Sequence, residues 1–129
     1  MILSFPWHTL LTPRPESSYV ALLGVVRLSD LRILPTFIRF GVQIERQLKR
    51  SPGAVGYRTG ADIPQPVFYH LSAWTSAEAI QEFIGTAPHG PAAEQLAGRL
   101  GPTSFRYWSV YGSQLPMHFR RELHRLTKE

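Results

Sequence analysis

The stretch Val67–Phe83, VFYHLSAWTSAEAIQEF, decides the fold, because its first half is typical of a strand and its second half of an amphipathic helix. Residues 67–74 are rich in aromatic and β-branched side chains, which favour a strand. Thr75 and Glu78 have the spacing of a capping box, so we expect a helix to begin at Thr75. The apolar face of that helix consists of Ala79, Ile80 and Phe83.

Upstream of this stretch, the sequence predicts another strand followed by another helix. Residues 19–28, YVALLGVVRL, are almost wholly apolar and indicate a central strand. Ser29 and Asp30 are good residues for a helix start, and Gly53 is suited to its end. The apolar stripe predicted for this helix comprises Leu34, Phe37, Ile38, Val42 and Leu48.

The remaining segments complete a β-α-β-β-α-β order. Residues 54–62 and 104–112 alternate in the manner of strands, and residues 91–101 predict a short helix between Pro91 and Gly101. This order predicts a ferredoxin-like α+β fold, with a four-stranded antiparallel sheet and helices on one face. We expect an irregular N-terminal arm over residues 1–18, one domain over residues 19–115, and a basic, helical C-terminal tail over residues 116–129.

Alternation along the strands predicts which side chains share a face of the sheet. In residues 67–74, one set contains Phe68, His70 and Trp74, and the other contains Tyr69 and Leu71. Large apolar groups therefore occur on both faces, although helices are expected to cover only one. We expect the open face to be shielded by a second copy of the chain, which predicts a homodimer.

Composition excludes several classes of protein and site. The chain of 129 residues suits one domain, and the lack of cysteine excludes disulfides and thiolate metal sites. No apolar run is long enough to span a membrane, no secretory signal is recognisable, and we expect a cytoplasmic protein. The net charge of +5 is concentrated near the C-terminus, where a solvated helix is preferred over a nucleic-acid or membrane contact. No metal-ligand spacing and no phosphate-binding loop stands out.

The strand FYHLSAW, the turn TSAE, the helix AIQEF and the following APHG resemble the dimeric α+β barrel superfamily. Within it, the chain is most similar to the antibiotic biosynthesis monooxygenase-like family, and to uncharacterised monooxygenase-like proteins of actinobacterial type. The segment FIRFGVQIERQLKRSPGAVGYR is similar to the first helix and second strand of that family. The resemblance covers residues 19–112 and implies a dimeric α+β barrel, whereas the fold itself hosts many chemistries.

The resemblance does not extend to the haem-degrading branch of the superfamily. Members of that branch use a Trp on the second helix, a later His and an Asn on the first strand. In this sequence the corresponding positions hold Phe83 and Ala93, and residues 19–26 contain no Asn. We therefore expect no cofactor, with haem kept as the alternative.

Two histidines are the candidate catalytic residues. His70 lies in the middle of a strand, where it is a general base, an axial ligand or a buried structural His. His89 lies in the loop TAPHGP, where it covers the mouth of a pocket or is a surface residue beside a proline turn. The candidate substrate-binding residues are Phe37, Tyr57, Arg58, Trp74, Phe83 and Tyr107. Of these, a core role is preferred for Trp74, and a solvated position at a sheet edge for Arg58.

These observations lead to two hypotheses of function. The first is a monooxygenase-like enzyme that acts on an apolar or aromatic, polyketide-like small molecule in a cavity between the sheet and the helices, with a general base. The alternative is a protein of the same fold that binds haem or a hydrophobic ligand without turnover. No metal site is expected in either case.

Overall fold

The computed structural model describes residues 3–62, 65–86, 96 and 100–122. Its regular elements follow the predicted β-α-β-β-α-β order, with two short strands added before the first long one. The elements are β1 (Leu3–Ser4), β2 (His8–Thr9), β3 (Ser18–Leu28), the 3-10 helix η1 (Leu31–Ile33), α1 (Leu34–Arg50), β4 (Ala54–Asp62), β5 (Val67–Trp74), α2 (Ala77–Gly85), β6 (Leu100–Tyr111) and the 3-10 helix η2 (Gly112–Gln114).

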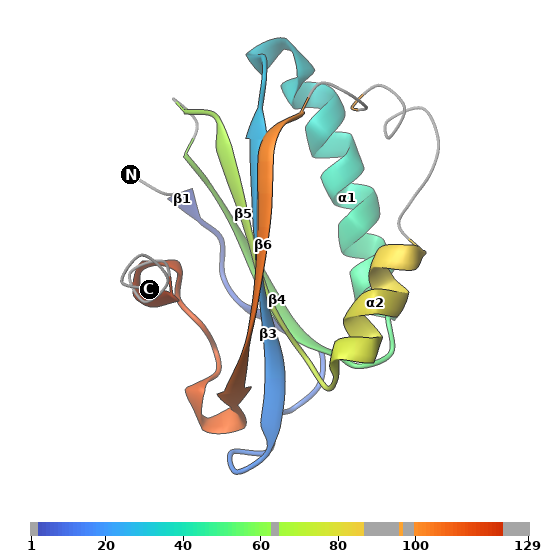
Figure 1. Cartoon of the computed structure of the whole chain (residues 1–129), viewed down its shortest axis with the longest axis vertical. Helices are drawn as coiled ribbons and strands as arrows, with labels where there is room; N and C mark the ends of the chain where they lie inside the picture. Colours follow the sequence, from blue (N-terminus) through green and yellow to red (C-terminus); the bar gives the residue numbers. More distant parts are fainter. Residues whose placement is uncertain (1–2, 63–64, 87–95, 97–99, 123–129) are drawn as a thin grey trace.

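The strands form one antiparallel sheet in the order β1-β4-β5-β3-β6, and β2 also pairs with β4. The four long strands are the predicted ones, and the two short strands come from the N-terminal arm. Both helices lie on one face of the sheet (Figure 1). This arrangement confirms the predicted ferredoxin-like α+β fold. In the part of the chain that the structure describes, no helix is long and apolar enough to cross a membrane.

Local signals explain where the helices begin, with one correction. The Asp30 carboxylate accepts a hydrogen bond from the Arg32 backbone N–H at the start of η1. The cap of α2 is Ser76, whose hydroxyl oxygen accepts from the Ala79 backbone N–H at 3.1 Å. The predicted cap, Thr75, is therefore wrong by one residue. Thr75 instead donates its backbone N–H to the carbonyl oxygen of Gly53, which joins the end of β5 to the turn before β4.

The inward face of α1 differs from the predicted stripe. The buried and half-buried apolar positions of this segment are Ile33, Leu34, Phe37, Phe40, Ile44 and Leu48. Ile38 and Val42, which were predicted to be part of the stripe, are 54% and 46% exposed. The reason is geometric, because successive residues of a helix are about 100° apart and a single helix can bury only a limited sector.

The face of the sheet opposite the helices is not left open. Met117 and Phe119, which follow η2, are almost completely buried against Leu23, Leu71 and Val110 of that face. The C-terminal segment and the N-terminal arm both run along this side of the sheet (Figure 1). The expectation of a bare face is therefore wrong for the middle of the sheet, because the chain covers that area with its own ends.

Arg58 links these two ends of the chain by hydrogen bonds. Its guanidinium donates to the Phe5 carbonyl oxygen at 3.1 Å, to Ser4 Oγ at 2.8 Å and to the Met117 carbonyl oxygen at 3.0 Å. It also lies 3.2 Å from Nδ1 of His118. Arg58 is consequently a connector between the arm and the C-terminal segment and not a solvated edge residue.

Two other predicted segments lie partly outside the described residues. Leu96, from the predicted helix over residues 91–101, is helical and buried. Strand β6 begins at Leu100, which is before the predicted end of that helix. Of the predicted helical tail, residues 119–122 are helical. His89 lies outside the described residues.

Candidate functional site

His70 lies in the middle of β5, on the face of the sheet that the helices cover. The register places it opposite Gly24 of β3 on one side and Thr59 of β4 on the other. Both directly paired neighbours of His70 in the sheet are therefore small residues.

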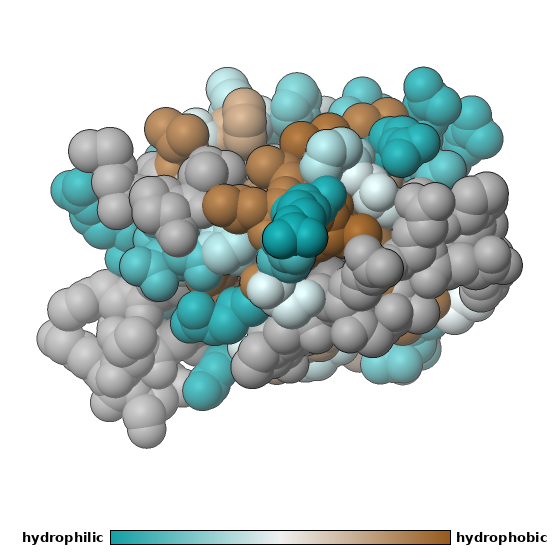
Figure 2. Space-filling view, turned by 90° about the horizontal axis from the view of Figure 1, so that it is seen from above, coloured by the Kyte–Doolittle hydropathy of each residue, from teal (hydrophilic) through white to brown (hydrophobic). Residues whose placement is uncertain are grey.

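Two buried apolar clusters flank the level of His70 between the sheet and the helices. One cluster surrounds Trp74 and Leu48, toward α2. The other surrounds Leu28 and Ile33, at the opposite end of the sheet, and includes the half-buried Phe68. At that end of the molecule, hydrophobic side chains gather in the middle and hydrophilic ones border them (Figure 2). His70 is thus a polar residue set between two apolar regions.

The electrostatic state of His70 follows from its burial. The ring as a whole is half-buried, but Nε2 is shielded from solvent and has no hydrogen-bond partner among the described residues. Burial lowers the pKa of His70 to about 4, because the charged form loses its hydration. The imidazole is therefore neutral at pH 7, and its unpaired buried nitrogen costs on the order of 1–3 kcal/mol.

Phe105 lies across β3 next to His70. Gly24 pairs with Phe105 on β6, and a Cβ atom at Gly24 would lie 3.1 Å from Cε1 of the Phe105 ring and 3.9 Å from Cβ of His70. The ring therefore occupies the space that a side chain at position 24 would fill. Phe105 is 55% exposed, so the ring has solvent on one side and room to turn. An incoming molecule can approach the imidazole if such a covering side chain moves.

Aromatic rings lie in the rows on both sides of His70. Phe68, two residues before His70 on the same face, contacts Phe37 with 4.6 Å between the ring centroids. Tyr107 follows Phe105 on β6 with the same orientation and is 47% exposed. These aromatic rings lie around His70 and form the kind of surface that binds apolar small molecules.

Tyr57 lies one row away, opposite Ser72 on the same face of the sheet. Burial and, to a smaller extent, the nearby Glu45 carboxylate raise its pKa to about 12, so its hydroxyl stays protonated. Although Glu45 is close enough to contribute to that shift, the buried hydroxyl has no partner at hydrogen-bonding geometry among the described residues. Burial is the larger cause of the raised pKa. The ring of His8 in β2 stacks on the Tyr57 ring, with 5.1 Å between the ring centroids.

The other predicted substrate-binding residues lie elsewhere. Trp74 is fully buried and donates a hydrogen bond from Nε1 to Ser72 Oγ at 2.8 Å. Its ring packs against that of Phe83, with 5.1 Å between the ring centroids. These contacts are those of a core residue. Arg58 is held by both ends of the chain on the other side of the sheet.

None of the predicted binding residues shares the row of His70 in the sheet, where Gly24 and Phe105 lie. Tyr107 and Tyr57 both lie in the next row. Phe37 contacts Phe68, which is two residues before His70 on the same strand.

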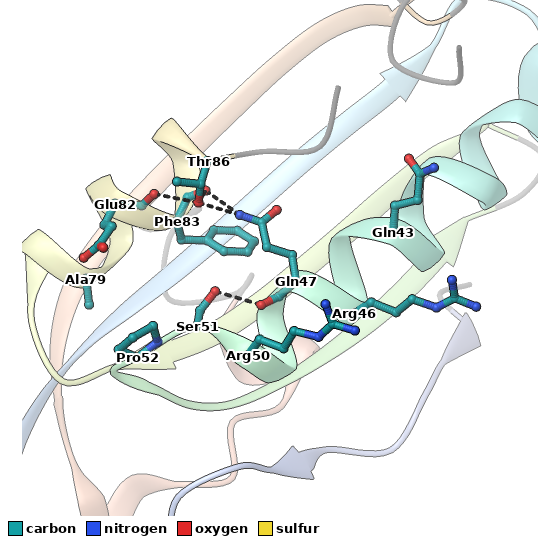
Figure 3. Close-up of a pocket in the computed structure, with 10 residues that line it drawn as sticks. All are labelled: Gln43, Arg46, Gln47, Arg50, Ser51, Pro52, Ala79, Glu82, Phe83 and Thr86. Atoms are coloured by element: carbon teal, nitrogen blue, oxygen red, sulfur yellow. Dashed lines mark hydrogen bonds between the residues drawn. The ribbon is translucent and has the colours of Figure 1, made fainter. Parts of the chain in front are cut away.

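Phe83 has a second environment, because it lines a surface cleft of about 510 Å³ between the C-terminal half of α1 and α2 (Figure 3). None of the residues that line this cleft lies in the same row of the sheet as His70. The cleft therefore lies apart from His70, whose pKa is lowered by burial beneath the helices. We place the candidate active site at His70, because a reaction needs a chemical group as well as space.

Sequence reasoning missed Gly24 and Phe105. A glycine inside the apolar run YVALLGVVRL is a signal for close approach of another group. The position of Phe105 beside His70 depends on the register of three strands, which no local pattern predicts. No group of three metal-ligating side chains occurs in the described ranges.

Comparison with solved structures shows which proteins share this fold. A monooxygenase candidate from Lactobacillus acidophilus matches with a TM-score of 0.61 and 14% identity, over 86% of this chain and 49% of that one. An antibiotic biosynthesis monooxygenase candidate from Deinococcus radiodurans matches with a TM-score of 0.57 and 15% identity, over 69% and 89%. SnoaB, a cofactor-independent oxygenase from Streptomyces nogalater, matches with a TM-score of 0.55 and 15% identity, over 78% and 100%.

This chain has the fold of the antibiotic biosynthesis monooxygenase-like proteins. At these identities the likeness concerns the fold and does not extend to the reaction. The chain spans about half the length of the Lactobacillus acidophilus protein. No family model matches the sequence, and the search of curated proteins found no match.

The lowered pKa of His70 predicts a pH dependence of stability. Between pH 6.5 and about 4, the unfolded chain binds a proton at His70 that the native chain does not bind. The free energy of unfolding should therefore fall as the pH drops through this window, by up to about 3 kcal/mol from this residue. Urea unfolding at pH 7 and pH 4.5 should show a smaller fall for His70→Phe than for the unmodified chain. Equal falls in the two proteins would show that His70 titrates normally.

Proposed function

We propose that this chain is a monooxygenase-like enzyme that acts on an apolar, aromatic molecule of the polyketide type, bound between the sheet and the helices, with His70 as general base. The observation that carries the proposal is the neutral imidazole whose Nε2 is buried and unpartnered beside Gly24 and Phe105. Such a nitrogen accepts a proton from an acidic C–H or O–H group of a substrate that displaces the covering side chains.

A pKa of about 4 makes the free imidazole a weak base, but the substrate changes that environment. When the proton moves to Nε2, an imidazolium forms next to an enolate or phenolate. The opposite charge stabilises the imidazolium and raises its pKa, most strongly where water is excluded. Tyr57, which stays protonated, is suited to donate a hydrogen bond to the developing oxyanion. His89 remains a second candidate base.

The electron-rich anion then reduces oxygen itself, so the chemistry needs no bound cofactor. Anthrone is a suitable probe, because it is a flat aromatic ketone with an acidic CH₂ group. One anthrone and one O₂ give one anthraquinone and one water, so the oxidised carbon loses two hydrogens and gains one oxygen. The shared fold with SnoaB, a cofactor-independent oxygenase, supports this class of reaction.

Oxygen uptake with anthrone tests the proposal. The purified chain, treated with a metal chelator, should accelerate oxygen consumption over the buffer rate and form anthraquinone in a 1:1 ratio to the oxygen consumed. Neither flavin nor haem should be required. If the chain gives the buffer rate with anthrone and with hydroxylated anthrones, the proposed reaction class is wrong.

The same unpartnered nitrogen also suits an alternative function, the binding of haem or another hydrophobic ligand without turnover. Imidazole Nε2 is a common axial ligand of haem iron. Titration with haem separates the two functions. A Soret band that disappears in His70→Phe, together with no oxygen uptake, would favour the binding function.

We propose further that two copies of the chain associate through the sheet face opposite the helices. Tyr69 and Trp108 remain only half-buried around the area that Met117 and Phe119 cover. A partner would complete the burial of these rings. Native mass spectrometry should show a mass twice that of the chain. A monomeric mass over the micromolar range would contradict the association.

A further inference from the structure

The cleft between α1 and α2 has two walls of opposite charge, and it lies apart from His70. Arg46 and Arg50, one turn apart in the last part of α1, form one wall, and Glu82 of α2 belongs to the other (Figure 3). Phe83 and Pro52 add apolar surface between them. A hollow of about 510 Å³ is large enough for a small organic molecule.

The charges of the two walls do not neutralise each other across the cleft. Neither arginine forms an ion pair with an acidic group among the described residues, whereas Lys49 Nζ on the same helix lies 3.6 Å from Glu45 Oε1. Glu82 likewise has no ion pair within that part of the chain. Both arginines are exposed. In Figure 3 the two arginines extend away from α2 and Glu82 extends away from α1, so these exposed side chains must turn to contact a molecule in the cleft.

Gln47 lies between the walls and fixes the distance between the helices. Its Nε2 donates to the Phe83 carbonyl oxygen at 3.1 Å and to Thr86 Oγ1 at 2.7 Å. These bonds use both donors of the amide and turn its oxygen away from α2 (Figure 3). The Oε1 atom is buried and has no partner among the described residues.

We propose that this cleft binds a small zwitterion, with the carboxylate on Arg46 and Arg50, the ammonium group on Glu82, and an apolar group against Phe83. Paired arginines suit a carboxylate, because a guanidinium can donate two parallel hydrogen bonds to it. The exposed charged side chains turn toward the ligand, which is a common side-chain adjustment on binding. The site is independent of the reaction proposed at His70.

Calorimetry with matched probes tests the zwitterion site. L-Phenylalanine or glycyl-phenylalanine, which differ in the separation of their charges, should bind saturably. Phenylpropanoate, which lacks the ammonium, and phenethylamine, which lacks the carboxylate, should bind at least about tenfold more weakly. Arg46→Gln and Arg50→Gln should each weaken binding of the zwitterion by about tenfold. Arg39→Gln, the same change on an exposed part of α1 that does not line the cleft, should change it by less than about twofold.

Three results would overturn the proposal. Binding of phenylpropanoate as tight as that of the zwitterions would show simple attraction of an anion, without recognition of the ammonium group. An equal loss in Arg39→Gln would show that binding depends on net charge alone. Absence of saturable binding for both zwitterions would show that the cleft does not bind this class. His70→Phe should leave zwitterion binding unchanged. The test of this cleft is therefore independent of the test of the oxygenase proposal.

Discussion

Replacement of His70 by phenylalanine should lower the rate of oxygen uptake with anthrone by about 10²–10⁴-fold, which is the usual contribution of a general base. Phenylalanine fills a similar volume but offers no proton acceptor. The fold should survive, because the change removes a buried nitrogen that has no partner among the described residues. The measurement is the initial rate of oxygen uptake, together with far-UV circular dichroism as a check of folding.

His118→Gln is a matched control for this experiment. His118 lies on the opposite side of the sheet, where its Nδ1 contacts Arg58 at 3.2 Å. Loss of this imidazole should leave the rate with anthrone within about twofold. A normal rate in a folded His70→Phe protein would remove His70 from the mechanism and would direct attention to His89.

Replacement of Trp74 by alanine should destabilise the chain by about 3–5 kcal/mol, which is the usual cost of deleting a fully buried large ring. Trp74 is wholly buried in contact with Phe83 and Ser72. A loss of this size is a large part of the stability of an ordinary domain, so the variant should unfold at a much lower urea concentration. Urea unfolding followed by circular dichroism measures the change.

The milder variant Trp74→Phe separates packing from catalysis. It keeps most of the ring but loses the hydrogen bond to Ser72 Oγ, so the free energy of unfolding should fall by about 1–2 kcal/mol. Because Trp74 lies in the core, the rate with anthrone should stay within about twofold of the unmodified rate. A folded Trp74→Phe protein with a loss as large as that of His70→Phe would place Trp74 in the active site.

The order of the elements was predictable because apolar periodicity and turn residues act locally. The run from Tyr19 to Leu28 and the alternation from Val67 to Trp74 correspond to β3 and β5 with shifts of at most one residue. The period of two also placed His70 on the same face as Phe68 and Trp74, and the structure shows that the helices cover this face. The cap at Ser76 was missed, because Thr75 has the same kind of side chain and only the backbone geometry selects between them.

Features that depend on distant segments were not predictable in the same way. The proximity of Phe105 to His70 needs the register of β3 with two other strands. The role of Arg58 needs both ends of the chain to meet on one side of the sheet. Likewise, the cleft that contains Arg46 and Glu82 exists only because α1 and α2 pack side by side. No local pattern in the sequence carries this information.

Anaerobic mixing of the chain with anthrone tests the central claim most directly, because it separates proton transfer to His70 from the later step with oxygen. At pH 7, where free anthrone is neutral, the unmodified chain should produce the visible absorption of the anthrone anion, and His118→Gln should do the same. His70→Phe should show none. Anion formation of equal extent in His70→Phe, or its absence in the unmodified chain, would contradict the account.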